Sequence, residues 1–364
     1  MPYMSTYPPP PKSKREVNRA GKAIGDGKGT EDDKALVDQW RASHGYVINT
    51  FQIFFKRRIQ KINSSIEFAQ RLKRRHTVID KITRRHPDGR PLMSDVTSMQ
   101  DFAGCRLIFD TLEDLRRFRD YVHSSKSMEH VAHKLRHDPS KYDYIHHPKS
   151  SGYRGIHDVY AHHPRAHRRG RKDSEPWQGL LVEVQYRTRV QHAWATALEI
   201  SDIVDGQKTK FDLNDSERVR FFALASEILA RFHEGIANAM VDLETDALCK
   251  EFSNLERSLG ILQRLHALKV SGGFDKFKRH NVLNVYKDDR GDLGLEIFTF
   301  SSPADAIEKA SQLESDPDSL NAVYVRADNP SQVRSAYRNY FNDAIDFVKL
   351  VREALASHGV NPDL

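Results

Sequence analysis

The segment GLLVEVQYR, residues 179–187, carries the most informative side chains of the chain. In a strand, successive side chains point to opposite faces, so this sequence separates an apolar set from a polar set. The apolar set is Val182, Val184 and Tyr186, and the polar set is Glu183, Gln185 and Arg187. A carboxylate, an amide and a guanidinium in one row can bind a charged ligand. Taken alone, the pattern also fits a polar face that only meets solvent.

Two further segments favour the interpretation as a binding site. In DFAGCR, Asp101 stands before a glycine and Arg106 follows on the expected strand. In PKSSGYRGIH, a glycine-containing loop carries Lys149, Tyr153 and His157. Cations suit phosphate groups and an aromatic ring suits a nucleobase, so this composition fits a nucleotide-binding loop. A surface loop with a packed tyrosine is the alternative for this segment alone.

Together these segments offer two carboxylates, Asp101 and Glu183, among many cations. The cations are Arg71, Lys73, Lys81, Arg106, Lys149, Arg154 and Arg187. A polyphosphate substrate brings several negative charges, so carboxylate oxygens can hold Mg²⁺ against it while Arg and Lys neutralise the remaining oxygens. Phosphoryl-type transfer depends mainly on positioning and electrostatic stabilisation, so no nucleophilic Cys or Ser triad is required. The residues therefore predict a magnesium-dependent site for a nucleotide polyphosphate.

The elements that position these residues indicate an α/β (α+β) fold. Short apolar runs bounded by Gly or Asp predict strands at 105–109, 155–161 and 179–187. Thr111 precedes an acidic turn and apolar residues at helical spacing, which predicts a capped helix after the first of these strands. Strands that alternate with helices predict a mixed β-sheet flanked by helices.

Four regions are expected along the chain. Residues 1–30 are rich in Pro, Lys and Gly, a composition typical of a disordered tail. A catalytic domain is expected over 31–210, opened by a long N-capped helix and continued by a basic helical stretch over 66–85. Residues 211–271 predict a helical connector. Residues 272–364 predict a small ββαβα domain of unassigned role.

Composition sets outer limits on function. The 364 residues carry 57 Lys and Arg against 50 Asp and Glu, a net charge of +7, which favours polyanionic partners. The two cysteines, Cys105 and Cys249, lie far apart and outside any Cys/His spacing, which indicates neither a disulfide framework nor a structural zinc site. The sequence has no apolar stretch of the roughly 18 residues that a membrane span needs, and its start has no apolar signal-peptide core. We therefore expect a cytoplasmic protein without a membrane segment.

Four motifs in a fixed order add specificity: RLK, DFAGCR, DYIHHPKSSGYRGIH and VEVQYRTRVQHAWA. In this order they resemble the synthetase domain of RelA/SpoT enzymes, particularly of the small single-domain alarmone synthetases. The resemblance covers residues 31–205. It implies a nucleotidyltransferase-like fold, with Mg²⁺ as cofactor. It also implies that the β,γ-diphosphate of ATP is transferred to the 3′-hydroxyl of GDP or GTP, leaving AMP.

The resemblance further implies roles for the matching residues. Asp101 resembles the Mg²⁺ ligand, and Glu183 the second acid, which either shares the metal or helps to deprotonate the acceptor hydroxyl. Tyr153 resembles the aromatic residue that stacks on the guanine of the acceptor. The ATP-binding residues would be Arg71, Lys73 and Arg106. The other acceptor-binding residues would be Lys149, His157, Gln185 and Arg187.

Some positions depart from the family pattern. The family commonly has GYRSLH or GYQSLH where this chain has GYRGIH, and IRT where it has YRT. Neither change removes a charged residue that was given a role above. The hydrolase half of bifunctional relatives would need a separate His and Asp metal site, but His137-Asp138 and His157-Asp158 are isolated dipeptides. We expect no hydrolytic metal site in this sequence.

Alternative functions stay open. Toxin-type relatives transfer the diphosphate to adenine nucleotides or to the 3′ end of tRNA, so tRNA is a candidate partner beside ATP and GDP or GTP. The basic loop PRAHRRGRK, residues 164–172, could contact RNA, and a non-enzymatic RNA-binding or regulatory module is the third candidate. Residues 211–364 could drive homo-oligomer formation or regulate the synthetase.

Overall fold

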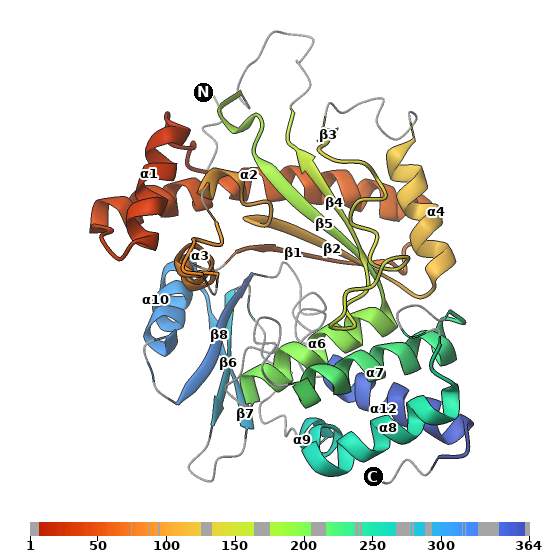
Figure 1. Cartoon of the computed structure of the whole chain (residues 1–364). Coiled ribbons are helices and arrows are strands. Elements are labelled where there is room, and N and C mark those ends of the chain that lie inside the picture. Colours follow the sequence, from red (N-terminus) through yellow and green to blue (C-terminus); the bar gives the residue numbers. More distant parts are fainter. Residues whose placement is uncertain are drawn as a thin grey trace. The chain divides into compact units, whose positions relative to one another are not determined.

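The computed structural model of the chain divides into two compact units (Figure 1). The first comprises residues 1–143 and 155–188, and the second comprises 144–154 and 189–364. The structure describes residues 7–73, 75–86, 88–93, 95–124, 133–163, 175–204, 216–236, 240, 242–266, 278, 280–287, 293–314, 316, 318–326 and 342–360. Each unit is described by itself below.

The first unit is built on a five-stranded mixed sheet. Its strands are β1 (Glu67–Leu72), β2 (Ala103–Phe109), β3 (Lys134–Leu135), β4 (Ile156–Ala161) and β5 (Leu181–Thr188). Their order is β1-β2-β5-β4-β3, in which β2 and β5 run parallel and the other neighbouring pairs run antiparallel. The predicted mixed sheet with flanking helices is therefore confirmed, as are the three predicted strands.

Helices α2 and α4 cover one face of this sheet (Figure 1). The helices of the unit are α1 (Lys14–Gly25), α2 (Glu31–Ile62), α3 (Arg75–Thr83) and α4 (Leu112–His123), with 3₁₀ turns η1 (Val96–Ser98) and η2 (Glu175–Trp177). The ring of Phe55 lies 6.0 Å from that of Phe68 in β1, and Phe118 lies 5.5 Å from Phe109 of β2. Phe55, Phe109 and Phe118 are 1% exposed or less. Together with the buried Val184 they form part of the hydrophobic core.

The expected helix caps are present. The hydroxyl of Thr30 accepts from the backbone N–H of Asp33, and the Asp33 carboxylate accepts from the N–H of Thr30. This reciprocal capping box starts α2 at Glu31. Thr111 caps α4 in the same manner, because its hydroxyl accepts from the N–H of Asp114 at 3.1 Å.

The prediction of a disordered N-terminal tail is wrong for the segment that forms α1. Its apolar residues recur at helical spacing and are buried, and they are Val17, Ala20 and Ile24. Gly21 lies against η1, since a Cβ at this position would stand 2.0 Å from Cγ2 of Val96. The prediction from glycine and lysine content therefore failed for a packed helix. Its Gly21 allows close contact with η1.

The continuous helical stretch expected over 66–85 is also wrong in its first part. This part forms β1, and only the part from Arg75 to Thr83 is helical. β1 pairs antiparallel with β2 along six residues, from Glu67 opposite Ile108 to Leu72 opposite Ala103. Pairing along the sheet overrides the helical spacing of this segment.

The second unit contains a helical core. Its helices are α6 (Arg189–Val204), α7 (Ser216–His233), α8 (Thr245–Leu259), α9 (Ile261–His266) and α12 (Asn342–Ser357). The indole N–H of Trp194 donates to the carbonyl of Phe222 at 2.7 Å, and Phe222 packs on Phe347 of α12. α12 packs on α6, α7 and α9, so the closing helix belongs to the helical core instead of to a separate small domain.

A small sheet with one helix precedes α12 along the chain in the second unit. The elements before α12 are β6 (His280–Lys287), β7 (Leu293–Phe300), α10 (Pro303–Glu314) and β8 (Ser319–Arg326). They form an antiparallel sheet of order β7-β6-β8. The division of the chain differs from the expected boundary at 210, because the second unit begins at Arg189 and also includes 144–154.

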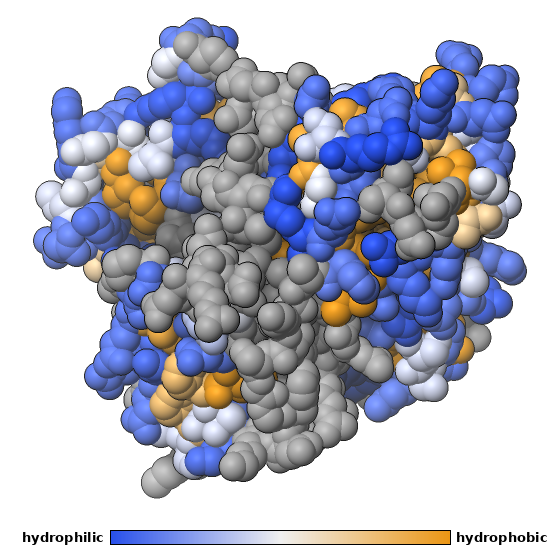
Figure 2. All heavy atoms as spheres, turned by 90° about the horizontal axis from the view of Figure 1, so that it is seen from below, coloured by the Kyte–Doolittle hydropathy of each residue, from blue (hydrophilic) through white to orange (hydrophobic). Residues whose placement is uncertain are grey.

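The view in Figure 2 shows a largely hydrophilic surface with small hydrophobic patches on the described residues. The large hydrophobic side chains exposed on this described part are Ile53 and Leu92. None of the helices that the structure describes is long and apolar enough to cross a membrane. The basic loop at 164–172, proposed above as an RNA contact, lies outside the described residues.

Candidate active site

The second face of the first unit's sheet, opposite α2 and α4, carries the predicted polar row of β5. Val182, Val184 and Tyr186 are fully buried, whereas Glu183 and Gln185 are partly exposed. The strand register places Glu183 opposite Gly104 of β2 and Gln185 between Arg106 of β2 and His157 of β4. The predicted alternation is therefore confirmed. The register brings four predicted site residues from three strands onto one face: Arg106, His157, Glu183 and Gln185.

A chain of hydrogen bonds links these side chains, and we call it the site network: Glu183, His157, Gln185, Arg106 and Arg187. His157 Nδ1 lies 3.1 Å from Glu183 Oε1, and Gln185 Nε2 donates to Glu183 Oε2 at 2.8 Å. Gln185 Oε1 accepts from Arg187 Nη2 at 3.1 Å and from Arg106 Nε at 3.4 Å. The guanidinium groups thus fix the orientation of the amide, and the amide and imidazole fix the carboxylate.

The site network keeps Glu183 ionised. Burial by itself raises the pKa of this carboxyl, because the charged form loses water. The hydrogen bond and charge of His157, the hydrogen bond from Gln185 and the charge of Arg71 outweigh burial and hold the pKa of Glu183 well below its ordinary 4.5. Arg71 reaches this neighbourhood because β1 pairs it with Gly104, which lies opposite Glu183.

Asp101 lies two residues before β2, between two lysines. Lys73 Nζ is 2.7 Å from Oδ2 and Lys81 Nζ is 3.0 Å from Oδ1. Burial raises the pKa of Asp101, but the two ammonium groups outweigh burial and the charge of Glu183, and the net pKa is lowered. Because the charge of Glu183 acts on Asp101, the two carboxylates share one electrostatic neighbourhood. Lys81 was counted among the cations of the sequence but was given no role.

The donor set fits a magnesium ion. Mg²⁺ prefers oxygen ligands from one or two carboxylates together with substrate phosphates and water. Asp101 and Glu183 are ionised carboxylates, and each oxygen engaged by one nitrogen donor keeps a further lone pair. Among the described residues no three His, Cys, Asp or Glu side chains gather as a closed metal site. A metal here would therefore depend on oxygens of the substrate.

Lys149 and Tyr153 belong to the second unit. Tyr153 is 7% exposed, and its ring packs in the helical core at 6.4 Å from Trp194 and 5.8 Å from Tyr144. Lys149 Nζ lies 4.4 Å from the Tyr144 ring and 5.4 Å from the Tyr153 ring. A base can stack on Tyr153 only after this ring turns out of the core, so the stacking role stays a prediction.

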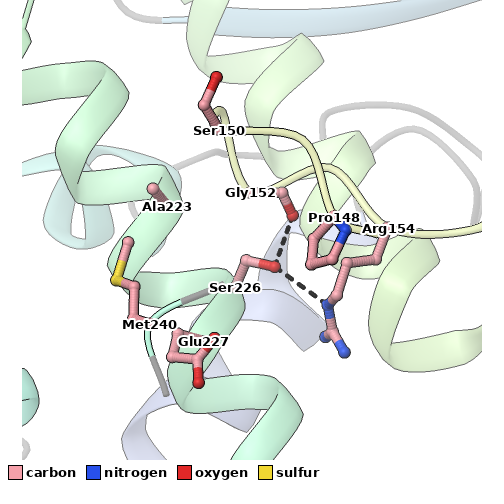
Figure 3. A pocket seen from close by; sticks show the side chains of 8 residues that line it. All are labelled: Pro148, Ser150, Gly152, Arg154, Ala223, Ser226, Glu227 and Met240. Atoms are coloured by element: carbon pink, nitrogen blue, oxygen red, sulfur yellow. Dashed lines mark hydrogen bonds between the residues drawn. The ribbon is translucent and has the colours of Figure 1, made fainter. Parts of the chain in front are cut away.

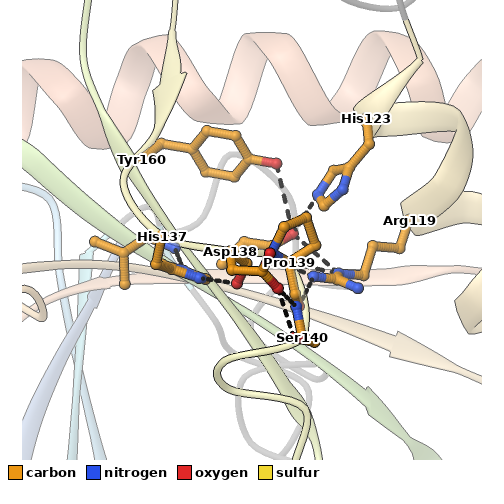
Figure 4. Close-up of polar contacts among 9 residues, drawn as sticks. Arg119, His123, His137, Asp138, Pro139, Ser140 and Tyr160 are labelled. Atoms are coloured by element: carbon orange, nitrogen blue, oxygen red, sulfur yellow. Dashed lines mark hydrogen bonds and ion pairs between the residues drawn. The ribbon is translucent and has the colours of Figure 1, made fainter.

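A second polar group lies on the helix-covered face of the sheet (Figure 4). We call it the buried ion cluster: Asp158, Arg119, His123 and Tyr160. Arg119 of α4 donates to Asp158 through Nη2 at 2.7 Å and through Nε at 3.2 Å, and His123 Nε2 lies 2.7 Å from Oδ2. The Asp158 side chain is fully buried. Sequence reasoning missed this cluster because its members are 35 and 39 residues apart.

The other His-Asp dipeptide serves the backbone, as Figure 4 also shows. His137 Nε2 accepts from the N–H of Val159 at 2.9 Å, and its Nδ1 lies 2.7 Å from the carbonyl of Asp138. The Asp138 carboxylate accepts from the N–H of Ser140 at 2.8 Å. The His137 ring and the Asp138 carboxylate are thus engaged in holding the loop before β4.

Residues 70–201 match the family model described as "Region found in RelA / SpoT proteins". The matched range contains every predicted site residue from Arg71 to Arg187. It begins later than the resemblance over 31–205, which included α2. A comparison with curated proteins found no match.

Solved structures of small alarmone synthetases are similar to the chain. Small alarmone synthetase 1 from Bacillus subtilis, bound to its product pppGpp, is 21% identical, with a TM-score of 0.39, over 60% of this chain and 94% of that chain. Small alarmone synthetase 2 from Bacillus subtilis is 20% identical, with a TM-score of 0.38, over 51% of this chain and 87% of that chain. The same synthetase 1 bound to AMPCPP is 16% identical, with a TM-score of 0.33, over 60% and 94%.

Proposed function

We propose that the chain is a pyrophosphotransferase that makes guanosine tetra- or pentaphosphate, a function supported by the match of residues 70–201 to the RelA/SpoT family model. The reaction moves the β,γ-diphosphate of ATP to the 3′-hydroxyl of GDP or GTP. The observation that carries the proposal is the placing of two carboxylates among cations: Lys73 and Lys81 contact Asp101, and Gln185 links Glu183 to Arg106 and Arg187. This arrangement matches the charges of two bound nucleotides.

The cations provide the binding energy for ATP phosphates. Lys73 and Lys81 contact Asp101. Arg71 of β1 pairs with Gly104 of β2, which lies opposite Glu183 of β5. The guanidinium of Arg106 lies on the same face of the sheet as Glu183 and donates to Gln185. Arg and Lys groups held near carboxylates stay charged and can exchange a carboxylate contact for a phosphate contact.

Asp101 and Glu183 would hold a Mg²⁺ ion, which supplies charge neutralisation at the phosphate oxygens. We assign Glu183 this holding role over that of general base. A general base works best with a pKa near the working pH, whereas the pKa of Glu183 is held well below 4.5. His157 and Gln185 then fix the direction in which Glu183 presents its oxygens.

The chemical step forms one bond and breaks one bond. The 3′-oxygen of the acceptor attacks the β-phosphorus of ATP, and the bond from that phosphorus to the α,β-bridging oxygen breaks. AMP leaves with the bridging oxygen, and the acceptor hydroxyl loses its proton to water. Because such transfers pass through a loose transition state, charge neutralisation and alignment contribute more than proton abstraction.

The test is transfer from ATP labelled at the γ-phosphate, with GDP, GTP, ATP and deacylated tRNA offered separately. We expect label in a guanosine 3′-diphosphate product together with one AMP per transfer. Asp101→Asn, which keeps the shape but removes the charge, should lower the rate by at least about a hundredfold. Transfer to tRNA or ATP alone would favour the toxin-type function, and no transfer to any acceptor would favour the non-enzymatic module.

A further inference from the structure

Loop 148–154 carries two of the predicted acceptor residues and is tied to a helix that lies outside the RelA/SpoT region. The loop and α7 both belong to the second unit. α7 begins at Ser216, beyond the matched range that ends at residue 201. A helix without a counterpart in the matched region therefore contacts the loop that is expected to recognise the acceptor.

Backbone hydrogen bonds make this loop a compact turn. The N–H of Gly152 donates to the carbonyl of Lys149 at 2.8 Å, and the N–H of Lys149 donates to the carbonyl of Tyr153 at 3.2 Å. Gly152 has a φ of 86°, in the left-handed region that favours glycine. The turn thus fixes the backbone of Lys149 relative to that of Tyr153.

Ser226 of α7 holds the turn on both sides of Tyr153 (Figure 3). Its hydroxyl donates to the carbonyl of Gly152 at 2.6 Å and accepts from Nε of Arg154 at 3.1 Å. A Cβ on Gly152 would lie 2.9 Å from Cα of Ala223, so the turn also packs closely against the helix. Beside these contacts lies a small hollow lined by residues of the loop, by α7 and by Met240.

An ion pair completes the attachment. Arg154 Nη1 donates to Oε2 of Glu234, directly after α7, and both side chains are only 3% exposed. Gln191 of α6 donates to the other Glu234 oxygen at 3.0 Å. Because both side chains are buried, removal of one partner leaves the charge of the other uncompensated inside the protein. We call Ser226, Arg154 and Glu234 the loop anchor.

We propose that Ser226 and Glu234 are positioning residues for the acceptor nucleotide. The inference rests on the proposed function, because it takes Lys149 and Tyr153 as acceptor residues. The loop anchor fixes the backbone on both sides of Tyr153. The Tyr153 ring can therefore turn about its own side-chain bonds while the backbone of Tyr153 and Lys149 stays in place. Such pre-organisation lowers the entropy cost of binding the acceptor and has no direct effect on ATP.

The test compares Ser226→Ala with wild type in the full chain. The variant leaves the Gly152 carbonyl and the Arg154 Nε without their buried partner, so we expect the KM for GDP or GTP to rise about tenfold. The KM for ATP should stay unchanged. Amide hydrogen exchange of residues 149–153, measured without nucleotide, should become faster, which provides a readout independent of activity.

Ser253→Ala is the matched control, because Ser253 is a buried serine of α8 whose hydroxyl donates to the carbonyl of Cys249 within its own helix. This control should change neither the acceptor KM nor exchange in the loop. Glu234→Gln is the second variant, should Ser226→Ala fail to fold, with Glu251→Gln of the Arg220 pair as its control. It too should raise the acceptor KM alone.

Two results separate the inference from the proposed function. If wild type shows no transfer to any acceptor, the proposed function fails. If wild type transfers but the anchor variants raise both KM values equally, or leave the acceptor KM and loop exchange at wild-type values, the positioning role is wrong.

Discussion

His157 and Asp158 are neighbours in β4, yet they belong to two polar groups on opposite faces of one sheet. The site network and the buried ion cluster use the same residue types, a carboxylate with a histidine and arginines. In the site network the Glu183 and His157 side chains are 18% and 14% exposed. In the buried ion cluster Asp158 is not exposed at all and accepts from Nε and Nη2 of Arg119.

The difference lies in what each carboxylate has left to offer. Asp158 is enclosed by its partners under α4, so its charge is fully used within the protein. Glu183 is held by an amide and an imidazole, and the neighbouring Arg71 carries charge that a ligand can use. Residue type alone does not separate a ligand site from a structural ion pair; burial and the surplus of cations do.

Glu183→Gln tests whether this carboxylate, unlike Asp158, acts on a ligand, and it has the largest expected effect. The amide keeps the size of the side chain but removes the charge, so we expect transfer to fall by at least about a hundredfold. The free energy of unfolding should fall less than in Asp158→Asn, because the Glu183 side chain is partly exposed whereas that of Asp158 is fully buried. Initial rates and urea unfolding measure the two quantities.

Glu113→Gln is the control for the same chemical change at an exposed position of α4. It should leave both rate and stability at wild-type values. A Glu183→Gln variant that transfers at the wild-type rate would show that Glu183 holds neither metal nor substrate.

Asp158→Asn should have the converse effect. It leaves Arg119 without a counter-charge in a buried place, and breaking a buried ion pair costs about 3–5 kcal/mol of unfolding free energy. The loss of rate should follow only the loss of folded protein. Urea unfolding with rates corrected for the folded fraction checks both. A variant of wild-type stability would show that the cluster is dispensable for the fold.

Much of this arrangement was predictable from local sequence. The alternation in β5 fixed which face of the strand carries Glu183, because a strand has a strict period of two. The caps at Thr30 and Thr111 were predictable because a cap bonds to the residue three positions later. Features that depend on a short stretch of chain can be read from that stretch.

The rest depends on partners far along the chain. Arg154 and Glu234 are 80 residues apart, and Arg119 and Asp158 are 39 apart, so no local pattern pairs them. β1 is a strand because β2 lies beside it, although its own residues also fit a helix. The placing of Tyr153 in a core follows from helices beyond residue 188, which nothing in the GYRGIH motif indicates.

The stabilisation from the buried ion cluster should also be lost in acid. Burial raises the pKa of Asp158, but hydrogen bonds from His123 and Arg119 outweigh it and lower the net pKa below 3.8. Because the folded pKa is below the unfolded one, the stabilisation is present above pH 3.8 and is lost as the pH falls through the folded value. Unfolding free energies in this acid range should fall more steeply for wild type than for Asp158→Asn; equal slopes would contradict the assignment.

Tyr160→Phe should have the smallest effect and tests whether the buried ion cluster is saturated. The Tyr160 hydroxyl lies 3.5 Å from Oδ2 of Asp158, at the limit of a hydrogen bond, while Arg119 and His123 make shorter contacts to the same carboxylate. Loss of the hydroxyl should therefore cost less than about 1 kcal/mol of unfolding free energy. A cost above about 2 kcal/mol in urea unfolding would mean that Asp158 needs a third partner, and the contrast with Glu183, which keeps capacity for a ligand, would then rest on exposure alone.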